Sequence, residues 1–282
     1  MGSVPPIPRL VEGISYFDHL HDHHLRSSCS LHEKGWEDRD MIRIFVLMVF
    51  LFLYAPIAFV IASSFLDNGS FTLKWFEKVF EDYKVIRAFS NSLILAIAST
   101  FFSVILGTAA AYAYIRTKMS FESLFYTPVV IPEIAEALSL LLFYNLLSFP
   151  LGFYSVLLGH IAFNVAFVFV IVKARLAGYE RSIEEASLTL GANEIQTFLR
   201  VTLPMAMPGI IAASLIAFTL SWDNFIKTVF TTGPGFQTLP MLIWSQAVRG
   251  VVSPSLNALA TLMLLISITL AYLYIRVSTK RE

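Results

Sequence analysis

The sequence predicts an all-α polytopic membrane protein with six transmembrane helices, and three observations lead to this fold class. Hydrophobic residues make up 56% of the 282 positions and charged residues only 14%, against about 45–50% and about 25% in soluble domains. The mean hydropathy is +0.69. The apolar residues lie in continuous stretches of about 20, the length that spans a bilayer as a helix. Strands of a membrane barrel would be shorter and would alternate apolar with polar residues.

Six apolar stretches are long enough to cross the membrane. They cover residues 42–65, 89–115, 124–147, 152–172, 208–230 and 255–275. Fourteen Lys and Arg residues fall on the side of the N-terminus and six on the other side, namely Lys74, Lys78, Lys84, Arg87, Lys227 and Arg249. Because basic residues concentrate in cytoplasmic loops, both termini are predicted to be cytoplasmic.

The remaining segments are polar. Residues 1–41 form a cytoplasmic extension, although translation starting at Met41 is a competing hypothesis for this segment. Residues 66–88 are predicted to be an extracytoplasmic loop with an amphipathic helix at 71–82, and residues 276–282 a cytoplasmic tail. The extension holds His19, His21, His23, His24, Cys29 and His32. Such residues can bind zinc, but their spacing matches no standard site, so chance composition is the preferred interpretation and no metal site is assigned.

A polar segment at 176–206 is predicted to form two short helices on the cytoplasmic side. Ser182 and Glu185 have the spacing of a capping box at the start of the first helix. Gly191 suits the left-handed position that ends it. Asn193 can cap the second helix, which Pro204 is expected to terminate. A docking element for a cytoplasmic partner would have this form.

The same segment carries a spaced motif. Glu185-Ala186-Ser187 is followed after three residues by Gly191, and after nine more by Val201-Thr202-Leu203-Pro204. This pattern resembles the EAA motif of binding-protein-dependent ABC importer permeases, with Ser187 and Val201 as conservative departures. The resemblance implies a MetI-like, type-1 permease fold over residues 89–275. It also implies coupling to an ATPase through Glu184, Glu185, Ala186, Ser187, Gly191, Leu203 and Pro204.

Further stretches are similar to the spermidine/putrescine-type permeases of this family. They include Pro132-Glu133, Gly152-Phe153-Tyr154-Ser155 leading to His160, and Ala217-Phe218-Thr219-Leu220-Ser221 with Asp223. The resemblance implies import of a polyamine or a related cationic amine by a multi-pass protein of the bacterial cytoplasmic (inner) membrane. The implied partners are the lipid bilayer, a homologous second permease, a pair of ATP-binding subunits and an extracytoplasmic substrate-binding protein.

The chain lacks the features of an independent ATPase. It has no Gly-x-x-x-x-Gly-Lys-Ser/Thr phosphate loop, and none of its 13 glycines is followed by lysine. No cofactor and no enzymatic activity are therefore expected in this chain, and ATP with Mg²⁺ would bind to the partner ATPase. Lys plus Arg and Asp plus Glu both number 20, a balance that excludes a strongly basic nucleic-acid-binding protein.

Acidic residues inside the spans are the candidate substrate contacts, because charges are costly there and are functional candidates by default. Glu133 and Glu136 share one face of the third span. With no lysine expected beside them inside the membrane, they would suit a cation, and aromatic rings could add cation–π attraction. The candidate pathway residues are Glu133, Glu136, Tyr144, Trp222, Asp223 and Asn224.

Alternatives remain for both the residues and the function. The acids could instead hydrogen-bond other helices or the partner permease, and His160 with Asn164 is expected to be an interhelical hydrogen-bonding pair. The cargo could be ferric iron, sulfate, phosphonate or a sugar in the same class of importer. An ATP-independent channel or secondary carrier is the alternative from another class, and the coupling motif argues against it.

Overall fold

The computed structural model describes residues 41–117, 122–178, 180–250 and 253–279. The chain divides into two compact units, Met1–Phe59 and Val60–Glu282, which are described separately. The predicted polar extension with its His and Cys cluster falls on residues 1–40, outside the described residues. The end of the predicted C-terminal tail, residues 280–282, also lies outside them.

The described part of the first unit is helical. It opens a candidate membrane span, Met41–Ser64, which agrees with the predicted span 42–65 to within one residue at each end. Arg43 is the only charged residue of this stretch in the sequence. An almost uncharged helix of this length is what the hydrocarbon core of a bilayer requires.

In the second unit, a short hairpin follows the end of the first helix and was not predicted. β1 (Leu66–Asp67) pairs antiparallel with β2 (Ser70–Phe71). The turn residues Asn68 and Gly69 have φ values of 49° and 82°. Asn-Gly is the dipeptide that favours such a two-residue turn, because both residues tolerate positive φ. This dipeptide was the available sequence signal for the hairpin.

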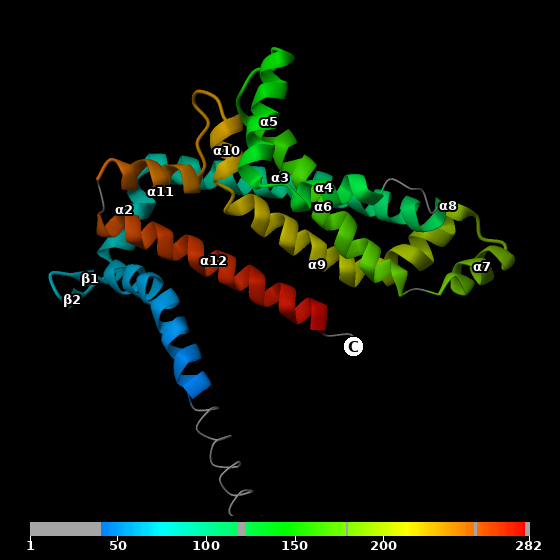
Figure 1. Ribbon diagram of the computed structural model, residues 1–282, viewed down its shortest axis with the longest axis horizontal. Coiled ribbons are helices and arrows are strands. Elements are labelled where there is room, and N and C mark those ends of the chain that lie inside the picture. Colours follow the sequence, from blue (N-terminus) through cyan, green and yellow to red (C-terminus); the bar gives the residue numbers. More distant parts are fainter. Residues whose placement is uncertain (1–40, 118–121, 179, 251–252, 280–282) are drawn as a thin grey trace, which may run out of the picture. The chain divides into compact units, whose positions relative to one another are not determined.

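Helices form the rest of the second unit (Figure 1). In chain order they are α2 (Lys74–Glu81), α3 (Tyr83–Thr117), α4 (Glu122–Val130), α5 (Glu133–Leu146), α6 (Phe153–Ala177), α7 (Arg181–Thr189), α8 (Glu194–Thr197), η1 (Phe198–Thr202), α9 (Leu203–Trp222), α10 (Ile226–Thr231), α11 (Leu239–Val248) and α12 (Pro254–Thr279). Within the described residues, five helices are long and apolar enough to cross a membrane, or up to six if α4 and α5 count as one bent span. The fold class is therefore confirmed as mostly helical and multi-pass.

The predicted third span, 124–147, is broken. Its two halves, α4 and α5, are bent by 109°, and Pro132 is the N-cap residue of α5. Proline lacks the N–H that a continuous helix would use, and it disfavours helical geometry in the residue before it. Glu133 therefore opens a new helix instead of lying in the middle of a continuous one.

The predicted fifth span, 208–230, begins and ends earlier than expected. α8, η1 and α9 join into one helical stretch, Glu194–Trp222, so Pro204 does not terminate the preceding helix but lies in the first turn of α9. In η1 the Leu203 N–H bonds to the Phe198 carbonyl, five residues back. This wider turn accommodates Pro204, which has no N–H and would crowd the carbonyl four residues before it in an α-helix.

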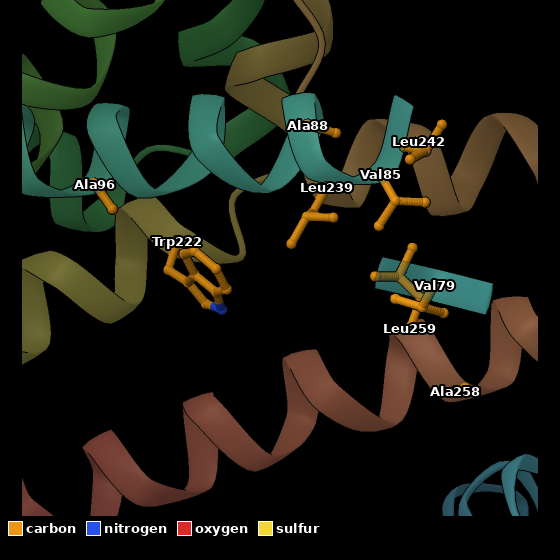
Figure 2. Packing of buried hydrophobic residues seen from close by; sticks show 9 residues of the cluster. All are labelled: Val79, Val85, Ala88, Ala96, Trp222, Leu239, Leu242, Ala258 and Leu259. Carbon is orange, nitrogen blue, oxygen red and sulfur yellow. The ribbon is translucent and has the colours of Figure 1, made fainter. Parts of the chain in front are cut away.

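Two clusters of buried apolar side chains hold the second unit together. One joins α2, α3, α11, α12 and the end of α9 (Figure 2) through Val79, Val85, Ala88, Ala96, Trp222, Leu239, Leu242, Ala258 and Leu259. The other joins α3, α6 and α9 through Ala111, Val168, Phe169, Val172, Leu176, Ala206, Ile210, Ala213 and Ala217. A Cβ at Gly107 of α3 would lie 2.7 Å from the Val168 side chain, so glycine permits the close approach of α3 and α6.

Candidate functional sites: the α7–α8 loop and a buried charge cluster

Gly191 ends α7 in the left-handed conformation, as predicted. Its φ is +92°, and its N–H bonds to the Leu188 carbonyl at 3.0 Å. Asn193 then caps α8, because its Oδ1 accepts from the Gln196 N–H at 2.8 Å. The Gln196 Oε1 in turn accepts from the Asn193 N–H at 3.1 Å. Both predictions are confirmed, and local backbone chemistry sets the turn between the two helices.

The start of α7 differs from the prediction in its chemistry. The helix begins at Arg181 with Glu180 as its N-cap residue. Ser182 already lies inside the first turn, and its hydroxyl donates to the Glu180 carboxylate at 3.4 Å. The predicted capping box of Ser182 and Glu185 is therefore wrong, because a capping side chain must come from the non-helical residue that precedes the helix.

Glu184 anchors the α7–α8 loop to the helical bundle. Only 7% of this residue is exposed. Its Oε2 accepts a hydrogen bond from Arg116 Nη2 at 2.9 Å, and its Oε1 accepts one from the Thr202 hydroxyl at 2.5 Å. Arg116 lies at the end of α3 and Thr202 at the end of η1. One carboxylate thus ties α7 to two candidate membrane spans.

The other residues of the predicted coupling set occupy different positions. Glu185, Ala186 and Gly191 are exposed, whereas the Ser187 hydroxyl is hydrogen-bonded to the Thr197 hydroxyl of α8 at 3.1 Å. Leu203 and Pro204 begin α9, the helix into which the loop leads. The motif therefore combines an outward surface with the first turn of a span.

The loop also presents large apolar side chains to its surroundings. Leu190 is 88% exposed and Ile195 71% exposed, and Ile183, Leu188 and Leu199 are exposed beside them. Figure 1 shows α7 and α8 together at one end of the second unit, away from α5 and α10. Exposed apolar side chains that gather in one place mark interaction sites.

A second site is built around Lys227 of α10. Its Nζ lies 3.0 Å from Glu136 Oε2 and 3.4 Å from Glu133 Oε1, and the residue is fully buried. The expectation that no lysine lies beside these two acids is therefore wrong. The sequence analysis counts Lys227 with the outer basic residues, at the end of the predicted span 208–230, but α9 ends at Trp222 and α10 packs against α5. A lysine flanked by Phe225, Ile226, Val229 and Phe230 was the available signal of burial.

Asn224 and Phe163 complete the surroundings of this charge cluster. The Asn224 Nδ2 donates to Glu133 Oε1 at 2.6 Å, and its Oδ1 accepts from the Lys227 backbone N–H at 3.0 Å. The Lys227 ammonium lies 3.3 Å from the centroid of the Phe163 ring on α6. Three of the predicted pathway residues, Glu133, Glu136 and Asn224, are thus brought together. Asp223 is exposed at the C-cap position of α9.

Trp222 and Tyr144, the predicted aromatic partners of a cation, lie in other surroundings. Trp222 is 1% exposed in the first apolar cluster (Figure 2), edge-on to Phe89 with 5.6 Å between the ring centroids. The buried Tyr144 donates its hydroxyl to the Ser155 carbonyl at 2.9 Å. Trp222 joins helices by packing and Tyr144 by its hydrogen bond, and the ring in contact with the charge cluster is that of Phe163, beside the Lys227 ammonium.

His160 and Asn164 form interhelical hydrogen bonds, as predicted. The two ring nitrogens of His160 on α6 lie 2.7 Å from the Ser221 hydroxyl and 3.0 Å from the Thr228 hydroxyl. The Asn164 Nδ2 donates to the Ala217 carbonyl at 3.1 Å. These bonds join α6 to α9 and α10. In the part of the chain that the structure describes, no group of three or more His, Cys, Asp or Glu side chains could hold a metal ion.

The fold defines the class of protein. It is similar to a bacterial ABC transporter that imports the acidic polysaccharide alginate, with a TM-score of 0.69, 18% identity and coverage of 86% of this chain and 96% of the other. A second structure of an alginate transporter includes an alginate pentasaccharide-bound periplasmic protein. The methionine transporter MetNI gives a TM-score of 0.55 at 18% identity, covering 68% and 93% of the two chains. The chain therefore has the fold of ABC importer permeases.

The family follows from the sequence. Residues 99–281 match the family described as binding-protein-dependent transport system inner membrane component, and the chain belongs to this family. It is 35% identical to the spermidine/putrescine permease PotC of Escherichia coli K12, over 80% of this chain and 89% of the relative. It is 37% identical to the putrescine permease PotI of the same organism, over 78% and 84%. These relatives are transport permeases, not enzymes.

Proposed function

We propose that this chain is a transmembrane permease subunit of an ATP-binding cassette importer for spermidine, putrescine or a related cationic amine. The observation that carries the proposal is the similarity to PotC and PotI, at 35% and 37% identity over 80% and 78% of this chain. The two relatives differ in the polyamine that their names specify, so the shared chemistry, a primary ammonium, is the proposed cargo class.

The proposed membrane arrangement has six spans with α4 and α5 counted as one. Five apolar helices and the bent pair supply these spans. Both termini would lie in the cytoplasm of a bacterial cell, because fourteen of the 20 basic residues then face the inside. The α7–α8 loop would lie on the cytoplasmic side under the same arrangement.

The proposed partners are a second, homologous permease, a pair of ATPase subunits that bind ATP and Mg²⁺, and an extracytoplasmic substrate-binding protein. The exposed Leu190 and Ile195 support docking of an ATPase at the α7–α8 loop. Movement of a docked ATPase would reach α3 and η1 through Glu184, whose carboxylate is hydrogen-bonded to both. The related alginate transporter with its periplasmic protein supports the third kind of partner.

The proposed cargo pathway passes the acids at the break of the third span. Glu133 has a side chain that is 35% exposed, against 14% for Glu136, so Glu133 is the acid that a cargo can reach. Asp223 is also exposed. Both would attract an ammonium group, and alternating access driven by the ATPases would carry it through.

One observation favours a different cargo in the same class of importer. Lys227 neutralises one of the two carboxylate charges at the break, so the site is less acidic than the sequence indicated. Sulfate, phosphonate and sugars do not depend on an acidic site and are the alternatives that this observation favours, while ferric iron, a trication, is tested as the fourth alternative.

The test is ATPase stimulation and uptake in proteoliposomes that contain this chain, its neighbouring permease, the ATPase and the binding protein. Spermidine and putrescine are expected to stimulate hydrolysis and to accumulate only with ATP. If only one of the other four cargo classes stimulates hydrolysis, the proposal that the cargo is a polyamine is wrong. Uptake in the absence of any ATPase would contradict the proposal that the chain works as part of an ATP-driven importer.

A further inference from the structure

The ammonium of Lys227 is held by the groups that proteins use to bind a free primary amine. Two carboxylates lie within 3.4 Å of it, and the Phe163 ring lies 3.3 Å away on another side. Carboxylates give charge-assisted hydrogen bonds to an ammonium, and an aromatic face attracts it through the ring quadrupole. The surroundings of Lys227 Nζ are therefore those of a primary-ammonium site.

This site is assembled from three helices. Glu133 and Glu136 come from the first turn of α5, Phe163 from α6 and Lys227 from α10. Anionic side chains are favoured in the first turn of a helix, where the backbone N–H groups are unpaired. The ammonium itself is fully buried, and a buried charge that lost its partners would be strongly destabilising.

The charges of the site do not cancel. Two carboxylates face one ammonium, so one negative charge remains when all three groups are ionised. Glu136 Oε2 is the nearer contact of Lys227 at 3.0 Å, and the more exposed Glu133 is 3.4 Å away and shares its Oε1 with Asn224. An external cation can therefore approach Glu133 while Lys227 still holds Glu136.

Of the two helices joined by this cluster, α5 begins at the break of a candidate span and α10 begins after the end of one. α5 follows the 109° bend after α4, and α10 follows the end of α9 at Trp222. The ion pairs of Lys227 hold α5 and α10 together near their starts. Replacement of Lys227 by a free ammonium would leave the net charge of the site unchanged and would break the ion pairs that join α5 to α10.

We propose that Glu133, Glu136 and Phe163 form a primary-ammonium site that the chain fills with its own Lys227, and that a cargo ammonium displaces Lys227 during transport. Lys227 is then a positioning and specificity residue, which keeps the site closed to ions that cannot compete with a primary amine. The displacement step rests on the proposed cationic cargo, whereas the existence of the ammonium site is independent of that proposal.

The first experiment tests the site without reference to cargo. Lys227→Ala removes three methylenes and the ammonium, which together equal propylammonium. Calorimetric titration of propylammonium into the purified permease–ATPase complex, without binding protein, is expected to show saturable binding to this variant. The wild-type complex and the double variant Lys227→Ala/Glu136→Gln should show none. Lys84→Ala, which removes an exposed lysine of α3, is the matched control, and 1-propanol is the uncharged control ligand.

Absence of saturable propylammonium binding to an assembled Lys227→Ala complex would overturn the ammonium site. Binding of 1-propanol with equal affinity would also overturn it, because the site would then recognise only the alkyl chain.

The second experiment tests displacement and uses a variant that retains the volume of the side chain. Lys227→Met keeps the apolar part of the side chain packed and removes its ammonium, which in the wild type competes with the cargo for the site. Since a tethered group competes at an effective concentration in the millimolar range, spermidine is expected to bind this variant on the order of tenfold more tightly than wild type. An unchanged spermidine affinity would overturn displacement. A wild-type complex that imports only a non-amine cargo would instead refute the proposed function, and the propylammonium result would stand.

Discussion

Arg116 and Glu184 are 68 residues apart in the sequence, and their side chains meet at 2.9 Å in the structure. The Thr202 hydroxyl occupies the other oxygen of the same carboxylate. Arg116 also lies over the Tyr112 ring, at 5.1 Å from its centroid, and that ring contacts Phe198 of η1 at 4.7 Å between centroids. The exposed α7–α8 loop is thus attached to two spans at one point, which is the arrangement needed to pass a movement from the loop to the membrane.

Loss of this attachment should uncouple the transporter. Glu184→Gln keeps the shape of the side chain and removes its charge, so the unfolding free energy is expected to fall by about 1–3 kcal/mol. Cargo-stimulated ATPase should fall toward the basal rate while the complex still assembles. The exchange Arg116→Glu/Glu184→Arg should recover part of the stimulation. Arg200→Gln, at an exposed position of η1, is the control, and an equal loss there would contradict the specific role of Glu184.

Gly191→Ala should strain the turn without a steric clash. The added Cβ would meet no atom within 4 Å. The turn would however force alanine to adopt the φ of +92° that glycine has here, and a residue with a side chain is strained at that value. The expected cost is about 1–2 kcal/mol, visible as weaker binding of the ATPase to the permease. Gly178→Ala, where φ is −85°, serves as the matched control. Equal effects of the two substitutions would show that the left-handed turn is unimportant.

Leu190→Asp should impair docking of the ATPase and leave the permease folded. Leu190 is 88% exposed, so its substitution is expected to change the unfolding free energy by about 0.5 kcal/mol or less. Co-purification of the ATPase with the variant should drop at least tenfold. Leu66→Asp makes the same chemical change in the hairpin, at a position that is 45% exposed, and should leave co-purification intact. Normal assembly of the Leu190 variant would exclude this side chain from the interface.

Tyr144→Phe should affect stability but not cargo selection. The Tyr144 hydroxyl donates to the Ser155 carbonyl at 2.9 Å, and loss of this bond is expected to cost about 0.5–1.5 kcal/mol. Thermal unfolding in detergent should show the cost, while the spermidine concentration for half-maximal ATPase stimulation stays unchanged. Tyr154→Phe, at a residue that is 71% exposed, should change neither quantity. A shift of the half-maximal concentration for Tyr144→Phe would return this residue to the pathway.

The proposed topology can be tested by cysteine labelling. The chain has one natural cysteine, so a Cys29→Ser background is free of thiols. In intact cells, a membrane-impermeant maleimide should label Ser70→Cys in the hairpin and should label Thr189→Cys only after permeabilisation. The reverse pattern would place the α7–α8 loop outside and would invert both termini.

Sequence reasoning succeeded where the structure depends on neighbouring residues. The turn at Gly191 and the cap at Asn193 follow from the conformational freedom of glycine and from the reach of a short amide side chain. The apolar spans follow from the thickness of the bilayer. Pro204 was predicted to end a helix, and the structural outcomes at Pro132 and Pro204 differ. One proline accompanies a 109° break, and the other is absorbed by the wider turn of η1.

Partners that are distant in the chain could not be predicted. Glu184 belongs to the predicted coupling set, but its partners Arg116 and Thr202 lie in other helices, and nothing in the sequence showed that they would contact it. Lys227 was expected at the outer end of the span 208–230 because hydropathy does not show that α9 stops at Trp222. Trp222 and Tyr144 were assigned to the pathway because residue type alone does not show which way a ring faces.

The sequence by itself determined the class of protein, the apolar spans and the turn of the α7–α8 loop, since each depends on composition or on spacings of a few residues. The tertiary structure decided which charges meet. Helix packing brings Lys227 to 3.0 Å from Glu136 and Arg116 to 2.9 Å from Glu184, over 91 and 68 residues of chain. Such pairings depend on the angles at which helices break and cross, and these angles are set by the packing of the whole bundle.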